Sequence, residues 1–275
     1  MNLEKNRKLV YKENIIDIPH PFVQYKKIIF EGTDNSQIEV DLTIPKSNIK
    51  GVIVDFPEFK VKNKDYLNLT KYSMLGYALA SLHIRGQAGN SENKTPCSHF
   101  PFIDCNYSKP YYNLVFQDSL DTIHLVEKLF PSKDIIATGI GQGAAISLVC
   151  ANYFESIKEL FILDCSLCDI KNNYNNNKKD SLFKNIRKFE TDYPDKLNYL
   201  YETLDSIDVL NISNRITQKV HYALSYLDPK TPIETQLKLL DTLQNVEIQH
   251  YKFLDYKKIF QHQFDDYMLE VLSNK

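Results

Sequence analysis

The chain has 275 residues, of which 43% are hydrophobic and 25% are charged. This size and composition suit one α/β domain with a sizeable core, and we predict a single domain over 1–275. A net charge of −2 gives no electrostatic reason to expect nucleic acid or an acidic membrane as a partner. No apolar run reaches the length of a membrane span and no signal-peptide region follows the polar N-terminus, so we expect a cytoplasmic protein.

Strands and helices are expected to alternate along the first half of the chain. Residues 1–20 read as a polar N-terminal arm with little periodicity. Alternating apolar residues predict a hairpin from 24–30 and 37–44. The elements expected next are a strand at 51–56, a helix at 66–75, a strand at 78–84 and an amphipathic helix at 111–130.

The alternation continues in the second half, interrupted by one insertion. The expected elements are strands at 134–138, 160–163, 219–224 and 247–253, and helices at 144–149, 231–243 and 264–272. Residues 170–206 are expected to form the insertion, with an Asn/Lys-rich loop at 172–179 followed by a cap-like helical stretch at 181–206. This order predicts an α/β fold with a mostly parallel sheet covered by helices on both faces.

The five cysteines are Cys97, Cys105, Cys150, Cys165 and Cys168. An odd number without a secretion signal argues against a disulfide framework. Cys165 and Cys168 form one C-x-x-C pair, but no second pair supplies the further ligands that a structural zinc site needs. We therefore expect free thiols at a strand end, no metal site and no cofactor.

The pentapeptide Gly-Ile-Gly-Gln-Gly at 139–143 is the most informative motif. It lies between an apolar strand and an apolar helix, which is the context of the G-x-S-x-G nucleophile elbow of the α/β-hydrolase fold. The outer residues, Gly139 and Gly143, suit a sharp turn that leaves no room for a Cβ. The centre is Gly141, which has no side chain and cannot form an acyl-enzyme. The motif predicts a hydrolase framework without its nucleophile.

Candidates for the other two triad members follow in the order that α/β-hydrolases use. Asp228 lies on the loop after the strand at 219–224, where an orienting carboxylate belongs. His262 lies beyond the last strand, in what we predict to be a loop before the last helix. Taken singly, Asp228 also suits an ordinary turn before Pro229, and His262 an ordinary surface histidine. Their order and placement favour the triad positions.

These motifs together resemble the acetyl xylan esterase and cephalosporin C deacetylase family of carbohydrate esterases, over about residues 25–272. The matching features are Arg85-Gly86-Gln87, the paired tyrosines Tyr111-Tyr112, the elbow with Gln142, the segment 201–216, Asp228-Pro229 with Pro232, and His262. The resemblance implies that Gly141 occupies the nucleophile position and that the backbone N–H groups of Phe59 and Gln142 are the oxyanion-hole candidates. It also implies a structural role for Arg85, Gly86 and Gln87, with a buried Arg85 paired to a carboxylate.

The chain departs from the family pattern at further positions. Gln263 follows the histidine where the family has glutamate, and Pro57-Glu58-Phe59 replaces a His-Gly-Tyr turn. Placing Glu58 beside the oxyanion hole disfavours an anionic intermediate. Changes at several places argue against a single engineered substitution at Gly141.

Two functional hypotheses remain open at this stage. The first is a non-hydrolytic family member that acts as a binding or partner module, taking a small acetylated ligand, a protein partner or a second copy of itself. The second is a weak or repurposed esterase in which Asp228 orients His262 and His262 activates a water molecule. The first is favoured because nucleophile, oxyanion turn and the residue after the histidine all differ.

Overall fold

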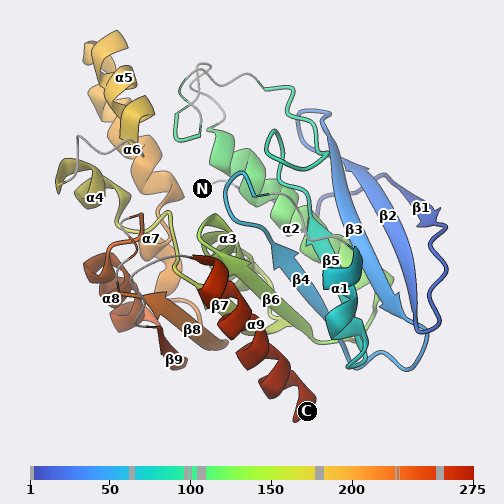
Figure 1. The fold of residues 1–275 in the computed structure, drawn as a ribbon. Helices are drawn as coiled ribbons and strands as arrows, with labels where there is room; N and C mark the ends of the chain where they lie inside the picture. The colour runs from blue at the N-terminus through green and yellow to red at the C-terminus, as the bar shows by residue number, and fades with distance from the viewer. Residues whose placement is uncertain are drawn as a thin grey trace.

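A computed structural model describes residues 3–61, 66–95, 99, 101–103, 110–176, 183–226, 228, 230–251 and 257–275. These residues form a 9-stranded sheet with helices on both faces (Figure 1). The strands are β1 (Tyr11–Ile16), β2 (Val23–Glu31), β3 (Gln37–Pro45), β4 (Gly51–Phe56), β5 (Tyr77–Leu82), β6 (Ile135–Ile140), β7 (Ile157–Leu163), β8 (Lys219–Ser225) and β9 (Val246–Tyr251). Their order across the sheet is β1-β2-β3-β5-β4-β6-β7-β8-β9.

The sheet has an antiparallel edge and a parallel body. β1, β2, β3 and β5 pair antiparallel in that order, and β5, β4, β6, β7, β8 and β9 are parallel. Every residue of β4 and β5 is buried, as expected of central strands covered on both faces. The predicted mostly parallel sheet is confirmed, and β6 carries the elbow from the middle of the sheet.

The prediction that residues 1–20 form only a polar arm was wrong for β1 (Tyr11–Ile16), which pairs with β2 along its whole length. None of its side chains is buried, so its hydrophobic pattern carries no strand signal. Backbone hydrogen bonds to β2 hold it in place. Residues of such an edge strand cannot be recognised by burial periodicity.

The helices are α1 (Tyr66–Ser73), α2 (Tyr111–Leu129), α3 (Gln142–Tyr153), α4 (Ile170–Asn176), α5 (Lys184–Asp192), a short 3₁₀ turn (Pro194–Lys196), α6 (Leu197–Ile207), α7 (Leu210–Ser213), α8 (Ile233–Thr242) and α9 (Lys257–Ser273). They divide the apolar core into two parts. On one face, α2 and α3 pack on side chains such as Val52 and Val54 of β4. On the other face, α1 and α9 pack on Ile53 and its neighbours. Successive side chains of β4 therefore pack alternately into the two parts of the core.

The insertion is helical where part of it was predicted to be a loop. The Asn/Lys-rich loop expected at 172–179 is wrong for its first part, because α4 continues to Asn176; residues 177–182 lie outside the described residues. Two features explain α4. Ile170 and Tyr174 are buried, and the Asp208 carboxylate accepts the N–H groups of Asp169 and Ile170 at 3.0 and 2.8 Å. Figure 1 shows α5 and α6 projecting beyond the sheet.

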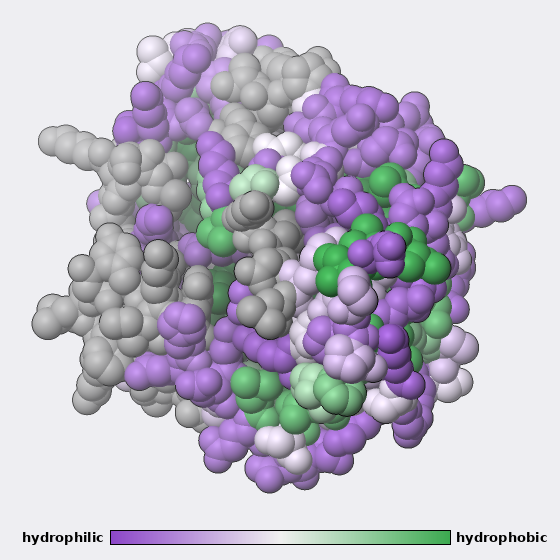
Figure 2. Space-filling view, turned by 45° about the vertical axis from the view of Figure 1, so that its right-hand side comes forward, coloured by the Kyte–Doolittle hydropathy of each residue, from purple (hydrophilic) through white to green (hydrophobic). Residues whose placement is uncertain are grey.

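The surface turned forward in Figure 2 is mostly hydrophilic, with apolar side chains in small separate groups. Among the described residues, no helix combines the length and the apolar character needed to cross a bilayer.

Arg85 is the largest side chain that is almost fully buried, with 1% of its surface exposed. Its guanidinium donates to both oxygens of Asp118, at 2.6 and 2.9 Å, and to Asp34 at 2.8 Å. Burial raises the pKa of the Asp118 carboxyl to about 6, and the adjacent Arg85 opposes that rise, so the pair is ionised at neutral pH. The predicted buried Arg85 with a carboxylate partner is confirmed. The Arg85–Asp118 pair joins the loop after β5 to α2.

Removing one charge of this pair should be costly. We expect Asp118→Asn to lower the free energy of unfolding by about 3–5 kcal/mol, because Arg85 then keeps a buried charge with one fewer counter-ion. Asp205→Asn makes the same chemical change in an exposed pair with Lys171 and should cost less than about 1 kcal/mol. Urea denaturation of both variants tests this. Equal losses would show that the Arg85–Asp118 pair contributes no more than a surface contact.

Candidate functional site

Gly141 forms a sharp turn between β6 and α3. Its backbone angles are φ 59° and ψ −113°, a combination that residues with a Cβ rarely adopt. Its N–H donates to the Leu163 carbonyl at 3.0 Å, and its own carbonyl accepts from Ser166 at 3.0 Å. The turn is therefore fixed by the backbone of the neighbouring β7 end. The predicted strand–turn–helix geometry is confirmed.

The two outer glycines allow this turn because backbone atoms meet there directly. A Cβ added to Gly139 would lie 2.2 Å from the Gly143 carbonyl carbon, and one added to Gly143 would lie 1.9 Å from the Phe56 carbonyl oxygen. Neither position can accept a side chain without moving β4, β6 or α3. The three atoms nearest to a Cβ on Gly141 all belong to the Glu58 side chain, the nearest at 3.2 Å.

These contacts predict unequal effects of alanine within one motif. Gly143→Ala should destabilise the protein by more than about 4 kcal/mol, since its Cβ would collide with backbone. Gly141→Ala should cost only about 1–3 kcal/mol, through its positive φ. Denaturant midpoints of the two variants provide the comparison. A larger loss for Gly141→Ala would contradict the packing described for Gly143.

Glu58 occupies the space in front of Gly141. The Glu58 Cγ lies 3.2 Å, and its Oε1 3.7 Å, from the position that a Cβ on Gly141 would take. A serine side chain would extend further into this space and would require Glu58 to move. Phe59 and Gln142, whose N–H groups are the predicted oxyanion-hole donors, line the same cavity as Glu58, so a carboxylate shares the cavity in which an anion was expected to be stabilised.

A pair of glutamine side chains joins the elbow to the loop after β4. Gln87 and Gln142 exchange two hydrogen bonds, at 3.0 and 2.8 Å. The side-chain oxygen of Gln87 also accepts the backbone N–H of Lys60 at 2.9 Å, and the side-chain NH₂ group of Gln142 donates to the backbone carbonyl of Pro57 at 3.2 Å. Both glutamines therefore fix the loop that carries Glu58. The structural role inferred for Gln87 agrees with these contacts, although its partners could not be read from the sequence.

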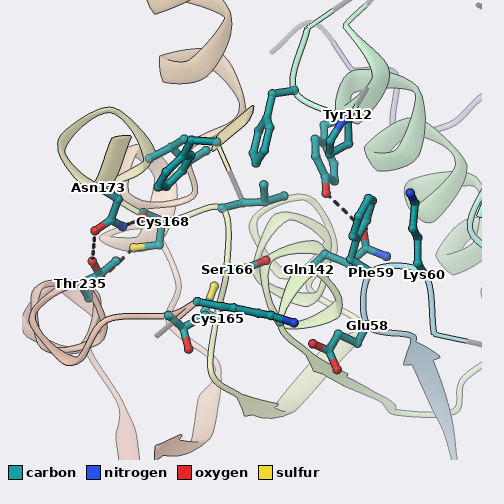
Figure 3. Close-up of a pocket in the computed structure, with 18 of the residues that line it drawn as sticks. Glu58, Phe59, Lys60, Tyr112, Gln142, Cys165, Ser166, Cys168, Asn173 and Thr235 are labelled. Carbon is teal, nitrogen blue, oxygen red and sulfur yellow. Dashed lines mark hydrogen bonds between the residues drawn. The ribbon is translucent and has the colours of Figure 1, made fainter. Parts of the chain in front are cut away.

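The elbow opens into a cavity of about 420 Å³. Figure 3 shows Glu58, Phe59 and Lys60 on one side, Tyr112 above Gln142, and Asn173 and Thr235 on the opposite side. Asn173 and Thr235 come from α4 and α8, so the insertion supplies part of the wall. The cavity has mixed walls of aromatic rings, amides and charged side chains, which suits a small molecule with polar groups.

Two thiols form part of the wall near Ser166. Cys165 and Cys168 are free thiols just after β7, as predicted, and both are buried. Cys97 and Cys105 lie outside the described residues. Burial raises the pKa of the Cys165 and Cys168 thiols well above the ordinary range. They stay protonated at neutral pH and act as apolar wall atoms rather than nucleophiles.

Asp228 lies in a loop, as predicted from the sequence, whereas His262 lies in helix α9. Asp228 accepts the Lys230 N–H and the Thr231 hydroxyl, each at 2.9 Å, in the loop after β8. His262 was predicted to lie in a loop, but α9 begins at Lys257 and contains it, because no glycine or proline interrupts 257–263. His262 is exposed, and buried Phe264 is two positions along, nearly opposite on the helix. Neither Asp228 nor His262 is among the described residues that line the cavity.

One cluster elsewhere has side chains of the kind that bind metal ions. Glu39, Asp41 and His83 offer ligand atoms within 4.8 Å of one another. However, both His83 nitrogens are already hydrogen-bonded, Nε2 to Asp41 at 2.8 Å and Nδ1 to the Asn90 N–H at 3.0 Å. Lys27 neutralises Glu39 at 2.8 Å. These contacts show a hydrogen-bonded side-chain network in which the potential ligand atoms of His83 already have partners.

The fold and the elbow define an esterase-type α/β-hydrolase framework. The profile of the acetyl xylan esterase family (AXE1) matches residues 2–273, so the chain belongs to this family. Comparison with curated protein sequences gives no significant match.

Several solved esterase structures have a similar fold. Acetyl xylan esterase 1 from Thermoanaerobacterium sp. JW/SL YS485 superimposes with a TM-score of 0.84 at 18% identity, covering 96% of this chain and 88% of the other. An acetyl xylan esterase from Paenibacillus sp. R4 gives a TM-score of 0.82 at 18% identity, covering 96% and 89%. A cold-adapted esterase from an Arctic intertidal metagenomic library gives 0.63 at 12% identity, covering 94% and 96%. These identities show a shared fold.

Proposed function

We infer that this protein is a non-hydrolytic member of the acetyl xylan esterase family that binds a small molecule in the cavity at the elbow. The arrangement of Glu58 and Gly141 carries the inference. Gly141 has no nucleophile, and the Glu58 side chain approaches to 3.2 Å from where a Cβ would begin. A negative charge at this place opposes the developing oxyanion on which ester hydrolysis depends. The site suits binding better than acyl transfer.

The cavity supports ligand binding because it has not been filled. A volume of about 420 Å³ lies within the range of small-molecule sites, and the Gln87–Gln142 pair holds one wall in place. A small acetylated ligand, as the family resemblance implies, would fit this space. A role in partner binding, including association with a second copy, remains compatible with the same cavity.

The alternative is a weak esterase that uses Asp228, His262 and a water molecule. One observation favours it: Lys230 and Thr231, which hold the Asp228 carboxylate, line the cavity. The exposed position of His262 on α9 speaks against it, because the base would have to reach the elbow. Esterase assays on variants separate the two readings.

The purified protein should show no serine-type esterase activity. We expect no labelling by a fluorophosphonate probe at the elbow and no turnover of p-nitrophenyl acetate above a protein blank. Turnover that disappears in both Asp228→Ala and His262→Ala would support the weak esterase instead. Turnover that survives both substitutions would place the activity at a different site.

Restoring the nucleophile alone should restore little activity. Gly141→Ser introduces a Cβ at a positive φ, 3.2 Å from the Glu58 Cγ, and the Glu58 carboxylate beside the elbow opposes the charge of an oxyanion. The measurement compares Gly141→Ser with the triple variant that also carries Pro57→His and Glu58→Gly. If Gly141→Ser alone reached a kcat/KM of about 10⁴ M⁻¹s⁻¹, the remaining site would be a working esterase site and our proposal would be wrong.

A further inference from the structure

Among the described residues that line the cavity, Glu58 is the one acid, and two lysines are the other charged side chains. Glu58 lies beside Gly141, whereas Lys60 and Lys230, which also line the cavity, are exposed. The negative charge is therefore the more deeply placed one. A ligand bound at the elbow lies beside this carboxylate. The exposed lysines contribute less to the electrostatic energy of such a ligand because solvent screens their charges.

Glu58 lies beside the N-terminus of helix α3. Gly141 is the N-cap of α3 and forms no side-chain cap. The N-terminus of a helix carries a partial positive charge and favours a nearby anion. Glu58 is the acid beside this end, with its Cγ 3.2 Å from the position that a Cβ on Gly141 would take.

The walls next to Glu58 are suited to an alkyl chain and to a cation. The rings of Phe59, Phe102, Tyr112 and Phe183 all line the cavity. The Lys60 ammonium lies 5.4 Å from the centre of the Phe59 ring, a cation–π distance. A cavity lined by a carboxylate and by aromatic rings suits an amine ligand with a short carbon chain.

From this geometry we propose that Glu58 is a specificity-determining residue that makes the cavity select small primary amines, with the ammonium group on the Glu58 carboxylate and the carbon chain against the aromatic wall. The proposal rests on the proposed binding function of the same cavity. A carboxylate offers about four acceptor positions and can therefore accept a ligand ammonium in addition to protein donors. Anionic ligands are disfavoured at the same place by like-charge repulsion.

Three probes of equal chain length isolate the charge. n-Pentylamine is protonated at neutral pH, 1-pentanol is neutral, and valerate is anionic. We expect isothermal titration of the full chain to give at least a roughly tenfold tighter Kd for pentylamine than for pentanol, and weaker binding still for valerate. Glu58→Gln, which keeps the shape of the side chain, should abolish the preference for pentylamine over pentanol.

Controls distinguish loss of charge from loss of fold. Glu234→Gln makes the same change on an exposed residue of α8 outside the cavity lining and should leave all three affinities unchanged. The thermal midpoint of Glu58→Gln reports whether that variant is folded, and pentanol binding reports whether its cavity persists.

Each outcome has a defined meaning. Equal binding of pentylamine and pentanol by the wild-type protein would overturn amine selection and leave the proposed binding function standing. An amine preference that survives Glu58→Gln would overturn the role of Glu58. No binding of any probe would contradict the proposal together with small-molecule binding. Ester hydrolysis by a protein that still prefers pentylamine would overturn only the non-hydrolytic function.

Discussion

The direct contact of backbone with backbone at the elbow is the constraint on which the site depends. Gly143 lies so close to the Phe56 carbonyl that a Cβ would approach to 1.9 Å, and Gly139 lies equally tightly against Gly143. This contact sets how near α3 comes to the ends of β4 and β6. It therefore fixes the position of the Gly141 turn and the path of the loop that carries Glu58. The hydrogen bonds of Gln142 then hold that loop in place, and the cavity follows from the arrangement.

Much of this could be predicted from the sequence because it depends on local patterns. The parallel body of the sheet follows from apolar runs alternating with amphipathic helices, and the elbow follows from its paired glycines. The burial of Arg85 and its pairing with a carboxylate could also be predicted. Its partners Asp34 and Asp118 were not, because they lie 51 and 33 residues away in the chain.

The elements that were missed owe their stability to distant groups. β1 carries no burial pattern and exists because β2 offers a free edge. α4 has an unfavourable Asn-rich composition and is stabilised at its start by Asp208, which lies 38 residues beyond Ile170. The start of α9, and with it the helical position of His262, also escaped prediction, although Phe260 lies four residues before Phe264 at helical spacing and gave a local signal. The contacts that hold β1 and α4, by contrast, span long stretches of chain. Long-range contacts of this kind leave no local signal.

The elbow is stable without a nucleophile because none of its fixing contacts uses a side chain at position 141. The N–H and carbonyl of Gly141 form hydrogen bonds with the Leu163 and Ser166 backbones. The next residue, Gln142, is held by the two side-chain hydrogen bonds that it exchanges with Gln87. Loss of a hydroxyl there costs catalysis but no structural hydrogen bond. Glycine also removes the strain that a serine would bear at φ 59°. The framework of the elbow therefore does not depend on a side chain at position 141, and the fold by itself does not fix the chemistry of the site.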